Sequence, residues 1–462
     1  MEKNIAYKRR QSWVARVGNI AIGGDNPIRI QSMTTTDTND TDACVEQAKR
    51  IIDAGGELVR LTTQGSREAE NMKNISTRLK ADGYTAPLVA DVHFNAHVAD
   101  VAARYCEKVR INPGNYVDPG RTFKHLEYTD DEYRQELQKI DQRLVPFIEI
   151  CREHHTAVRI GVNHGSLSDR IMSRYGDTPA GIVESCMEFL RIFRREQFDD
   201  VVISIKASNT VVMVESVRLL VRAMDAEDMH YPLHLGVTEA GEGEDGRIKS
   251  AVGIGALLTE GIGDTIRVSL SEEPECEIPV ARKLVDLIPE CWQLRQEAEA
   301  SVADDTITIA LDAPDWDTLQ LKAAMAAGAL LIDRKATKLS IINSRFPAER
   351  LTSLADAILQ AARIKFTKTE YISCPGCGRT LYNLQDTIRR IKAATSHLVG
   401  LKIGIMGCIV NGPGEMADAD YGYVGAGRGK ISLYRQKECV AKNIPEEEAV
   451  ERLLELIENE RR

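Results

Sequence analysis

Between residues 28 and 290, the hydrophobic pattern alternates short apolar runs with longer segments of helical period. The runs are IRIQSM, ELVRLTT, PLVADVHF, KVRINPGN, AVRIGVNHG, DVVISIKAS, PLHLGVTEAG and DTIRVSL. Such runs are typical of buried parallel strands, and the segments between them, such as 41–54 and 179–194, predict connecting helices. Eight strand–helix units in about 260 residues predict an α/β fold with a (β/α)8 barrel of the TIM type.

Four of the predicted strands carry an arginine between two apolar residues: Arg60, Arg110, Arg159 and Arg267. Side chains alternate along a strand, so apolar neighbours that face the helices leave each arginine facing the barrel interior. Lys206 ends a fifth strand. We therefore expect five cations near the C-terminal mouth of the barrel, where the active sites of this fold lie.

The predicted strand ends supply few anions, chiefly Asp91 and Glu239. Buried charges must be paired, so the excess of cations predicts an anionic ligand, and guanidinium and ammonium groups both suit phosphate oxygens. Their number suggests more than one phosphate. The alternative is that single arginines pair with carboxylates on neighbouring strands or loops. Polar residues beyond the strands could bind the same oxygens: Asn112, Asn163, Ser208, Asn209 and Ser269.

The stretch GEGEDGR at 241–247 contains G-x-G-x-x-G. Its acidic residues would repel a pyrophosphate, so we interpret it as a mobile loop rather than as a dinucleotide site.

A second chemical signal lies in the C-terminal part. Cys374 and Cys377 form a C-P-x-C pair in SCPGCGR, and Cys408 follows in MGCIVNGPGE. Three thiolates predict an iron–sulfur or zinc site, and the lack of a second CxxC argues against a four-thiolate zinc ribbon. The residues alone leave the fourth ligand open between Glu415, Cys439 and water. The seven other cysteines are expected to be structural, mostly as small buried hydrophobic residues: Cys44, Cys106, Cys151, Cys186, Cys276, Cys291 and Cys439.

Length and charge narrow the class of protein. The 462 residues suggest about three domains, which we expect at 1–290, 291–370 and 371–462. The pattern in 291–370 predicts a strand or two and at least two helices, which is too little structure for a confident separate core. A net charge of -10 argues against a nucleic-acid partner. The chain has no signal-type N-terminus and no membrane-length apolar run, so we expect a cytoplasmic protein, or one in a plastid-type matrix, with no membrane partner.

The motifs QSMT, RINPGN, IGVNHGSL, KAS, GVTEAGEG, RVSL, SCPGCGR and MGCIVNGPGE occur in this order. Together they resemble the 4-hydroxy-3-methylbut-2-enyl diphosphate synthase family of the methylerythritol phosphate route to isoprenoids. The resemblance covers the barrel and the C-terminal part. It implies a [4Fe-4S] cluster held by Cys374, Cys377, Cys408 and Glu415 in a C-terminal α+β domain.

The resemblance also implies the reaction: reductive ring opening and dehydration of 2-C-methyl-D-erythritol 2,4-cyclodiphosphate, with electrons from flavodoxin or ferredoxin. Asp91 and Glu239 would lie beside the reacting carbons, with Glu239 as proton donor. The substrate residues map onto Arg60, Arg110, Asn112, Arg159, Asn163, Lys206, Ser269 and Asn411. Arg267 is our addition from the strand pattern.

Family members pair head to tail, which implies a homodimer. The motifs on both sides of the middle stretch resemble the three-domain form of the family, but 291–370 is far shorter than that form's extra domain. This leaves open whether the barrel is covered by its own chain or by the partner.

Two other classes account for part of the pattern. A phosphate-ester barrel of the pteroate-synthase kind, with a structural zinc, explains the cations but gives Glu415 no role. A metal-ribbon interaction module on a barrel scaffold would not be an enzyme. Both predict a colourless protein, whereas an iron–sulfur protein is brown.

Overall fold

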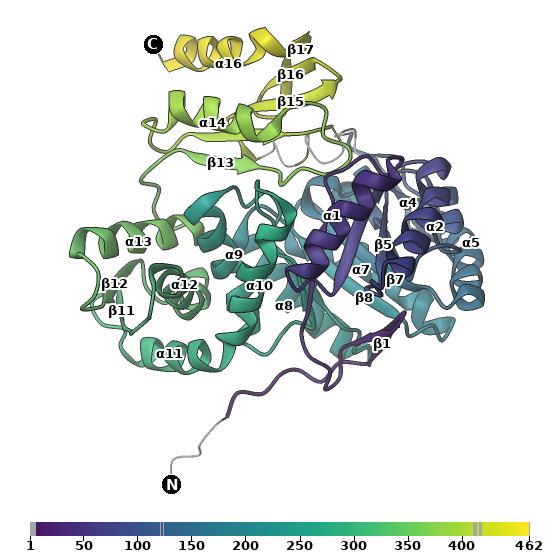
Figure 1. The fold of residues 1–462 in the computed structure, drawn as a ribbon, viewed down its shortest axis with the longest axis horizontal. Helices are drawn as coiled ribbons and strands as arrows, with labels where there is room; N and C mark the ends of the chain where they lie inside the picture. The colour runs from purple at the N-terminus through teal and green to yellow at the C-terminus, as the bar shows by residue number, and fades with distance from the viewer. Residues whose placement is uncertain (1–5, 121, 123, 410–413, 415–417, 462) are drawn as a thin grey trace.

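The computed structural model describes residues 6–120, 122, 124–409, 414 and 418–461 (Figure 1). Eight parallel strands form the barrel, in the order β8-β7-β6-β5-β4-β3-β10-β9. A bridge between Ile203 and Leu233 joins the two ends of this sheet and closes the cylinder. The strands are β3 (Arg29–Met33), β4 (Leu58–Thr63), β5 (Leu88–Val92), β6 (Lys108–Ile111), β7 (Ala157–Asn163), β8 (Val201–Lys206), β9 (His234–Leu235) and β10 (Thr265–Ile266).

Helices surround the barrel as the alternating pattern predicts (Figure 1). The apolar neighbours of each strand arginine, such as Val59 and Leu61 beside Arg60, belong to the core between strands and helices. The arginines therefore lie on the inner face of the sheet. The helices are α1 (Thr41–Asp53), α2 (Ser66–Ala81), α3 (Ala96–Ala102), α4 (Pro113–Tyr116), α5 (Asp130–His154), α6 (Asp169–Tyr175), α7 (Pro179–Arg195), α8 (Thr210–Ala226), α9 (Gly243–Leu258), α10 (Glu277–Asp286) and α11 (Ile288–Ala300).

The segment 241–247 differs from the prediction of a mobile loop, because α9 already begins at Gly243. Glu244 and Asp245 occupy its first turn, where negative side chains are favoured by the helix dipole.

A short hairpin closes the N-terminal end of the barrel. Strands β1 (Ala15–Val17) and β2 (Ile20–Ile22) pair in antiparallel fashion. Ala15, Val17 and Ile22 pack in one apolar cluster with the first inward-facing residues of four barrel strands: Leu58, Val89, Ala157 and Val202. A ligand would therefore enter from the opposite end.

The middle stretch forms a β-α-β-α unit against the side of the barrel. It consists of β11 (Thr306–Ala310), α12 (Trp316–Ile332), β12 (Lys338–Ile342) and α13 (Ala348–Ala361). β11 and β12 pair in parallel. Helix α12 is buried from Thr318 to Ile332, and it packs closely on α9 because a Cβ atom at Gly328 would lie 2.8 Å from the Val252 carbonyl oxygen. Its apolar side chains belong to the same continuous core as those of the barrel.

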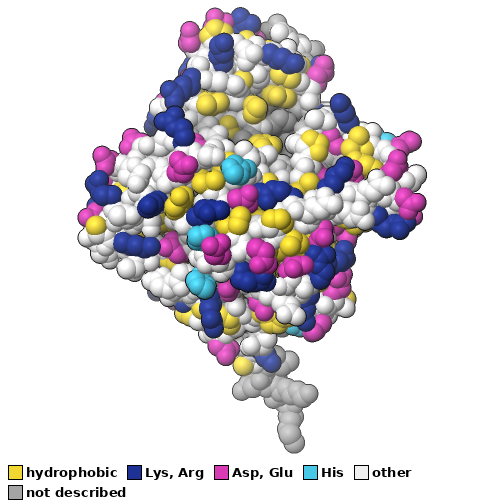
Figure 2. Space-filling model, turned by 90° about the vertical axis from the view of Figure 1, so that its right-hand side faces the viewer, with side chains coloured by type: hydrophobic (Ala, Val, Ile, Leu, Met, Phe, Trp, Pro, Cys, Tyr) yellow, Lys and Arg dark blue, Asp and Glu magenta, His cyan; other side chains and the backbone are white. Residues whose placement is uncertain are grey.

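The C-terminal domain, residues 370–461, has a separate apolar core. Its sheet runs β13-β14-β15-β16-β17, parallel at first and antiparallel from β15 onward. Figures 1 and 2 show it as a smaller lobe seated on the barrel, at the end opposite to β1. Its elements are β13 (Glu370–Ser373), α14 (Leu384–Thr395), β14 (Lys402–Met406), β15 (Tyr421–Gly427), β16 (Lys430–Arg435), β17 (Glu438–Pro445) and α16 (Glu446–Arg461).

Among the described residues, no helix combines the length and the apolar character needed to cross a membrane.

Candidate functional site

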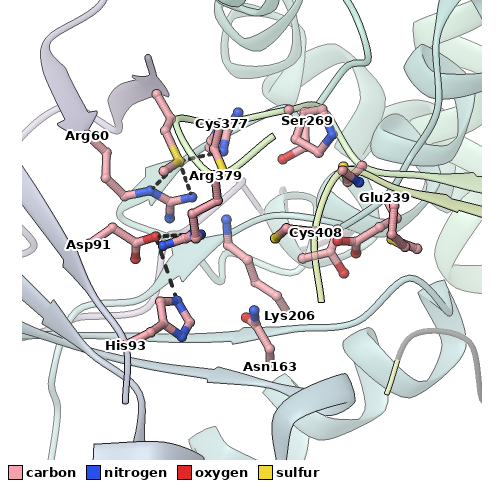
Figure 3. A pocket seen from close by; sticks show the side chains of 18 of the residues that line it. Arg60, Asp91, His93, Asn163, Lys206, Glu239, Ser269, Cys377, Arg379 and Cys408 are labelled. Atoms are coloured by element: carbon pink, nitrogen blue, oxygen red, sulfur yellow. Dashed lines mark hydrogen bonds and ion pairs between the residues drawn. The ribbon is translucent and has the colours of Figure 1, made fainter. Parts of the chain in front are cut away.

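A cavity of about 710 Å³, including its part open to solvent, lies where the C-terminal domain meets the barrel mouth (Figure 3). The barrel contributes Met33, Arg60, Asp91, His93, Arg110, Asn163, Lys206, Thr238, Glu239, Arg267 and Ser269. The C-terminal domain contributes Cys374, Pro375, Gly376, Cys377, Arg379, Met406, Gly407 and Cys408. The charged strand ends and the cysteine motifs therefore share one cavity within one chain.

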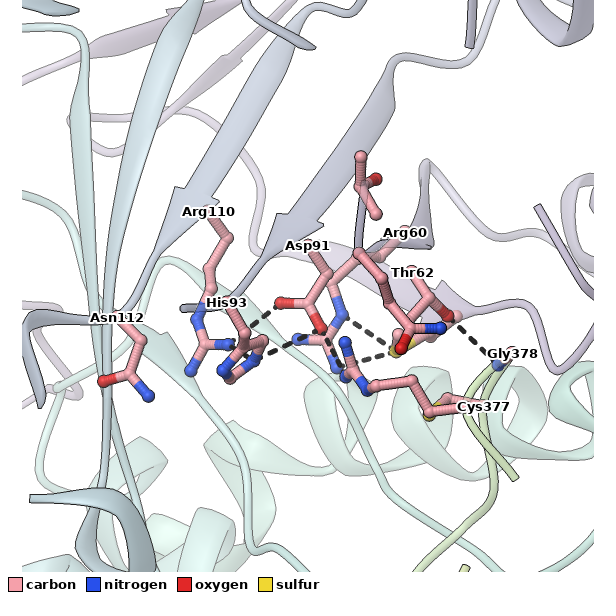
Figure 4. Close-up of polar contacts among 12 residues, drawn as sticks. Arg60, Thr62, Asp91, His93, Arg110, Asn112, Cys377 and Gly378 are labelled. Carbon is pink, nitrogen blue, oxygen red and sulfur yellow. Dashed lines mark hydrogen bonds and ion pairs between the residues drawn. The ribbon is translucent and has the colours of Figure 1, made fainter. Parts of the chain in front are cut away.

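Asp91 is the central anion of this cavity (Figure 4). Arg110 Nη1 donates to its Oδ1 at 3.0 Å, and Arg379 Nη2 donates to its Oδ2 at 3.0 Å. Burial disfavours its charge, but the positive charges of Arg60 and Arg110 outweigh burial and hold the pKa of Asp91 well below its usual value. Asp91 is therefore ionised at neutral pH.

Three other cations have little negative charge close to them. Arg60 donates from Nε and Nη2 to Met33 Sδ at 3.0 and 2.8 Å, and sulfur is only a weak acceptor. No carboxylate among the described residues lies within 4.0 Å of Lys206 or Arg159. Burial, strengthened by neighbouring guanidinium groups, lowers the pKa of both residues and that of Arg60, the last to about 10. The described lining of the cavity nevertheless has more basic than acidic side chains.

Arg267, like Arg110, has a carboxylate partner close by. It lines the cavity, but its Nε and Nη2 donate to the two carboxylate oxygens of Glu277 on α10 at 3.0 and 2.9 Å. Burial opposes the charge of Arg267, yet the carboxylate outweighs it and raises the pKa. The alternative that single arginines pair with carboxylates therefore holds for Arg110 and Arg267, although Glu277 lies on a helix rather than on a strand or loop.

Glu239 follows β9 in an unusual conformation. Its φ is 50°, a left-handed value that a non-glycine residue rarely adopts. The side chain is buried, and Oε2 has no hydrogen-bond partner among the described residues. Burial raises the pKa of Glu239 above its ordinary value, against the opposing effects of Thr238 and Lys249. A buried carboxyl that holds its proton can act as an acid.

The predicted polar residues divide into two groups. Asn163 and Ser269 line the cavity. Asn112 and Arg159 are buried nearby but are not part of its lining. Asn112 accepts from the Gly114 amide at 3.1 Å and donates to Ser166 Oγ at 2.8 Å, so its amide supports the local turn.

Cys374, Cys377 and Cys408 line the C-terminal side of the cavity and are half-buried. The Gly407 amide donates to Cys374 Sγ at 3.2 Å. Within the described ranges, no three His, Cys, Asp or Glu side chains are arranged to hold a single metal ion, yet the three thiols reach the same cavity, as a larger inorganic group would need. Glu415 and Asn411 lie outside the described residues. Of the seven cysteines expected to be structural, Cys44, Cys106, Cys151, Cys186 and Cys291 are buried, Cys439 is half-buried and Cys276 is exposed.

Several cavity residues were not among those predicted to bind, and three of them contact its charged groups: Met33, His93 and Arg379. His93 contacts Arg110 through Nε2, and burial together with that charge lowers its pKa well below the usual value, so the ring is neutral. Arg379 is basic and lies two residues after the C-P-x-C pair, a signal that could have been used.

The sequence matches two family models, described as the GcpE TIM-barrel domain over residues 13–282 and the GcpE protein C-terminal domain over residues 370–459. The chain belongs to the GcpE family. Three relatives, from Bacteroides fragilis, Phocaeicola vulgatus and Akkermansia muciniphila, are 53%, 52% and 42% identical. The first covers 98% of this chain over 96% of its own length, the second 98% over 98%, and the third 98% over 96%. All three are named 4-hydroxy-3-methylbut-2-en-1-yl diphosphate synthase (flavodoxin).

These matches confirm the family resemblance, the barrel fold and the synthase activity predicted from the motifs. Members of the GcpE family are iron–sulfur enzymes. The alignment with the Bacteroides fragilis relative runs over 599 positions, whereas this chain has 462 residues. Well over a hundred aligned positions therefore have no counterpart here.

Proposed function

We propose that the chain converts 2-C-methyl-D-erythritol 2,4-cyclodiphosphate to 4-hydroxy-3-methylbut-2-enyl diphosphate by reductive ring opening and dehydration, with flavodoxin or ferredoxin as electron donor in the cytoplasm. The observation that carries this proposal is the pairing of a cation-rich barrel mouth with three cysteines in one cavity. The relatives' names specify flavodoxin, which favours that donor over ferredoxin.

The two phosphates of this substrate match the surplus charge. Arg60, Arg110 and Lys206 line the cavity, and we assign them to the phosphate oxygens because guanidinium and ammonium groups bind phosphate well. Arg159 adds positive charge from beside the cavity. Asn163, Ser269 and Asn411 would donate further hydrogen bonds, and Asn112 would hold the turn beside them.

The proposed cofactor is a [4Fe-4S] cluster held by Cys374, Cys377, Cys408 and Glu415. Three thiols at one cavity are the donor set that such a cluster needs, and Gly407 already donates a backbone hydrogen bond to one sulfur. When bound, the cluster would supply the two electrons of the reaction one at a time.

The protein's own contribution to the chemistry is charge placement and one proton. In balance, two electrons and one proton enter, the ring C–O bond breaks to leave a diphosphate, and a hydroxyl departs as water. Glu239 is the proposed donor of that proton, because its carboxyl lines the cavity and burial raises its pKa, which favours the protonated form. Asp91 stays ionised and orients Arg110.

We also propose the domain division predicted at 1–290, 291–370 and 371–462, with Glu370 counted in the C-terminal part because β13 begins there, and with the middle stretch bridging the other two. The proposed homodimer would not need to exchange domains, because residues of one chain line the cavity from both sides. Sedimentation of the cluster-loaded protein would test for the dimer.

Anaerobic purification with iron and sulfide assays tests the function most directly. We expect brown protein with about four iron and four sulfide per chain and turnover of the cyclic diphosphate with reduced flavodoxin. Glu415→Ala should lose turnover and iron. A colourless zinc protein without turnover would contradict the proposal and favour a structural-metal barrel.

A further inference from the structure

Arg379 reaches from the C-terminal domain into the barrel. It lies two residues after Cys377, its side chain is 9% exposed, and its Nη2 donates to Asp91 Oδ2 at 3.0 Å. The loop that carries it is seated on the barrel rim (Figure 4). The Gly378 amide donates to Thr62 Oγ1 at 3.0 Å, and a Cβ atom at Gly378 would lie 2.5 Å from the Thr36 carbonyl oxygen. The position of Arg379 is therefore set by close backbone contact between the two domains.

Arg379 shares its anion with a second cation. Asp91 cannot neutralise it fully, because the same carboxylate also accepts from Arg110 through its other oxygen. The guanidinium groups of Arg110 and Arg379 thus share the carboxylate of Asp91 at the wall of the cavity.

One nitrogen of the Arg379 guanidinium is buried but makes no hydrogen bond to the described residues. Its Nη1 is inaccessible to solvent and has no hydrogen-bond partner among the described residues. A buried donor without a partner is costly, so such a group indicates a ligand or water that completes it. Because the guanidinium is planar, Asp91 can hold one nitrogen while the other donates to a bound group.

We propose that Arg379 is a substrate-binding residue: held by Asp91 through Nη2, it donates from Nη1 to a phosphate oxygen of the cyclic diphosphate. This rests on the proposed function and deepens it, because the domain that carries the cysteines then also binds the substrate. Since this contact forms only when that domain is seated on the barrel, substrate favours the seated arrangement.

The test compares substrate affinity in cluster-loaded, full-length proteins by anaerobic calorimetry. Arg379→Gln should weaken binding about 10- to 100-fold, the usual value of a charge-assisted hydrogen bond. The affinity of Arg379→Lys should lie between those of wild type and Arg379→Gln. An ammonium group keeps the positive charge but lacks the planar fork that can bind Asp91 and phosphate together. Lys392→Gln is the matched control. Lys392 pairs with Glu242 across the same two domains at 3.0 Å but does not line this cavity. The substrate affinity of Lys392→Gln should therefore stay within about 3-fold of wild type.

The outcomes separate this inference from the proposed function. No binding of the cyclic diphosphate by wild type would overturn the proposed function. Binding by wild type with equal affinity in Arg379→Gln, at normal iron content and melting temperature, would overturn the role of Arg379 alone. If Arg379→Gln loses iron, the comparison is repeated on metal-free wild type and variant. The same loss of affinity is expected there, and equal affinities would again overturn the role.

Discussion

Ala240 and Ser373 form a parallel β-bridge that joins the barrel to the C-terminal domain beside the cavity. Each is the chain neighbour of a residue proposed to take part in the reaction, Glu239 and Cys374. Ser271 supports the junction by donating from Oγ to the Cys374 carbonyl oxygen at 3.0 Å. The proposed proton donor and the first of the three cysteines are thus placed together by backbone pairing, which is more rigid than contact between long side chains.

Glu239→Gln should abolish proton donation while keeping the shape of the site. We expect kcat to fall about 10²- to 10⁴-fold with substrate affinity nearly unchanged. Only the protonated carboxyl can donate, and burial raises its pKa, so wild-type turnover should fall as pH rises through that raised value. The variant should lack this limb of the pH profile. Wild-type turnover in Glu239→Gln would remove the residue from the mechanism.

Lys206 and Arg267 should respond differently to substitution by Met. Lys206 has no described carboxylate within ion-pair distance, so Lys206→Met should weaken substrate binding about 10- to 100-fold. Arg267→Met leaves Glu277 buried and unpaired, so it should lower the free energy of unfolding by about 3–5 kcal/mol, with a smaller loss of affinity. Calorimetry and denaturant unfolding measure the two effects.

A double variant provides the control for this contrast. Arg267→Met combined with Glu277→Met removes both charges and should recover most of the stability lost in Arg267→Met alone. Equal losses of affinity in Lys206→Met and Arg267→Met would show that ion pairing with Glu277 does not decide which cation binds substrate.

The inward position of the strand arginines could be predicted because it follows from local alternation. Arg60 must face the barrel interior once Val59 and Leu61 face the helices. The pairing of Arg267 with Glu277 could not be predicted. Glu277 lies on the next helix, and its approach to Arg267 depends on how the chain folds back after the strand. Arg379 illustrates the same limit: its position beside Cys377 is visible in the sequence, but its partner Asp91 is 288 residues away.

Local signals were also missed. Glu244 and Asp245 argue against pyrophosphate binding, but they are equally the acidic first turn of a helix. Gly236, just after β9, marks a close approach of the backbone. A Cβ atom at Gly236 would lie 2.8 Å from Lys206 Nζ, so the chain after β9 passes directly beside a cavity cation.

Lys108 supplies a prediction on stability. Its side chain is fully buried inside the barrel, and Nζ has no partner among the described residues. Burial, with added repulsion from Arg159 and Arg60, lowers its pKa well below the usual value. Lys108→Met should therefore raise the free energy of unfolding of the substrate-free protein at pH 7 by about 1–4 kcal/mol.

The pH dependence of that gain follows from proton linkage. Between the lowered folded pKa and the unfolded value near 10.4, the unfolded chain binds a proton that the folded chain lacks. Lys108 therefore destabilises the folded wild-type protein less as pH rises. The difference in free energy of unfolding between Lys108→Met and wild type should shrink toward pH 10. Lys139→Met, at an exposed lysine on α5, should stay within about 0.5 kcal/mol of wild type. An advantage that grows with pH would contradict a lowered pKa of Lys108 in the folded protein.

Glu370 is the point at which all three parts of the chain meet. Its Oε1 accepts from Lys249 of the barrel helix α9 at 3.3 Å, and its Oε2 accepts from Arg363, just after α13, at 2.6 Å. All three side chains are about nine-tenths buried, so Glu370→Gln leaves two buried cations without their anion. We expect the free energy of unfolding to fall by about 3–5 kcal/mol and limited proteolysis of 362–370 to accelerate, because the C-terminal domain is held less firmly.

The matched control is Asp245→Asn, which breaks the more exposed pair with Lys368 and should lower the free energy of unfolding by less than about 1 kcal/mol. Equal proteolysis rates in the two variants would show that Glu370 does not fasten the domains.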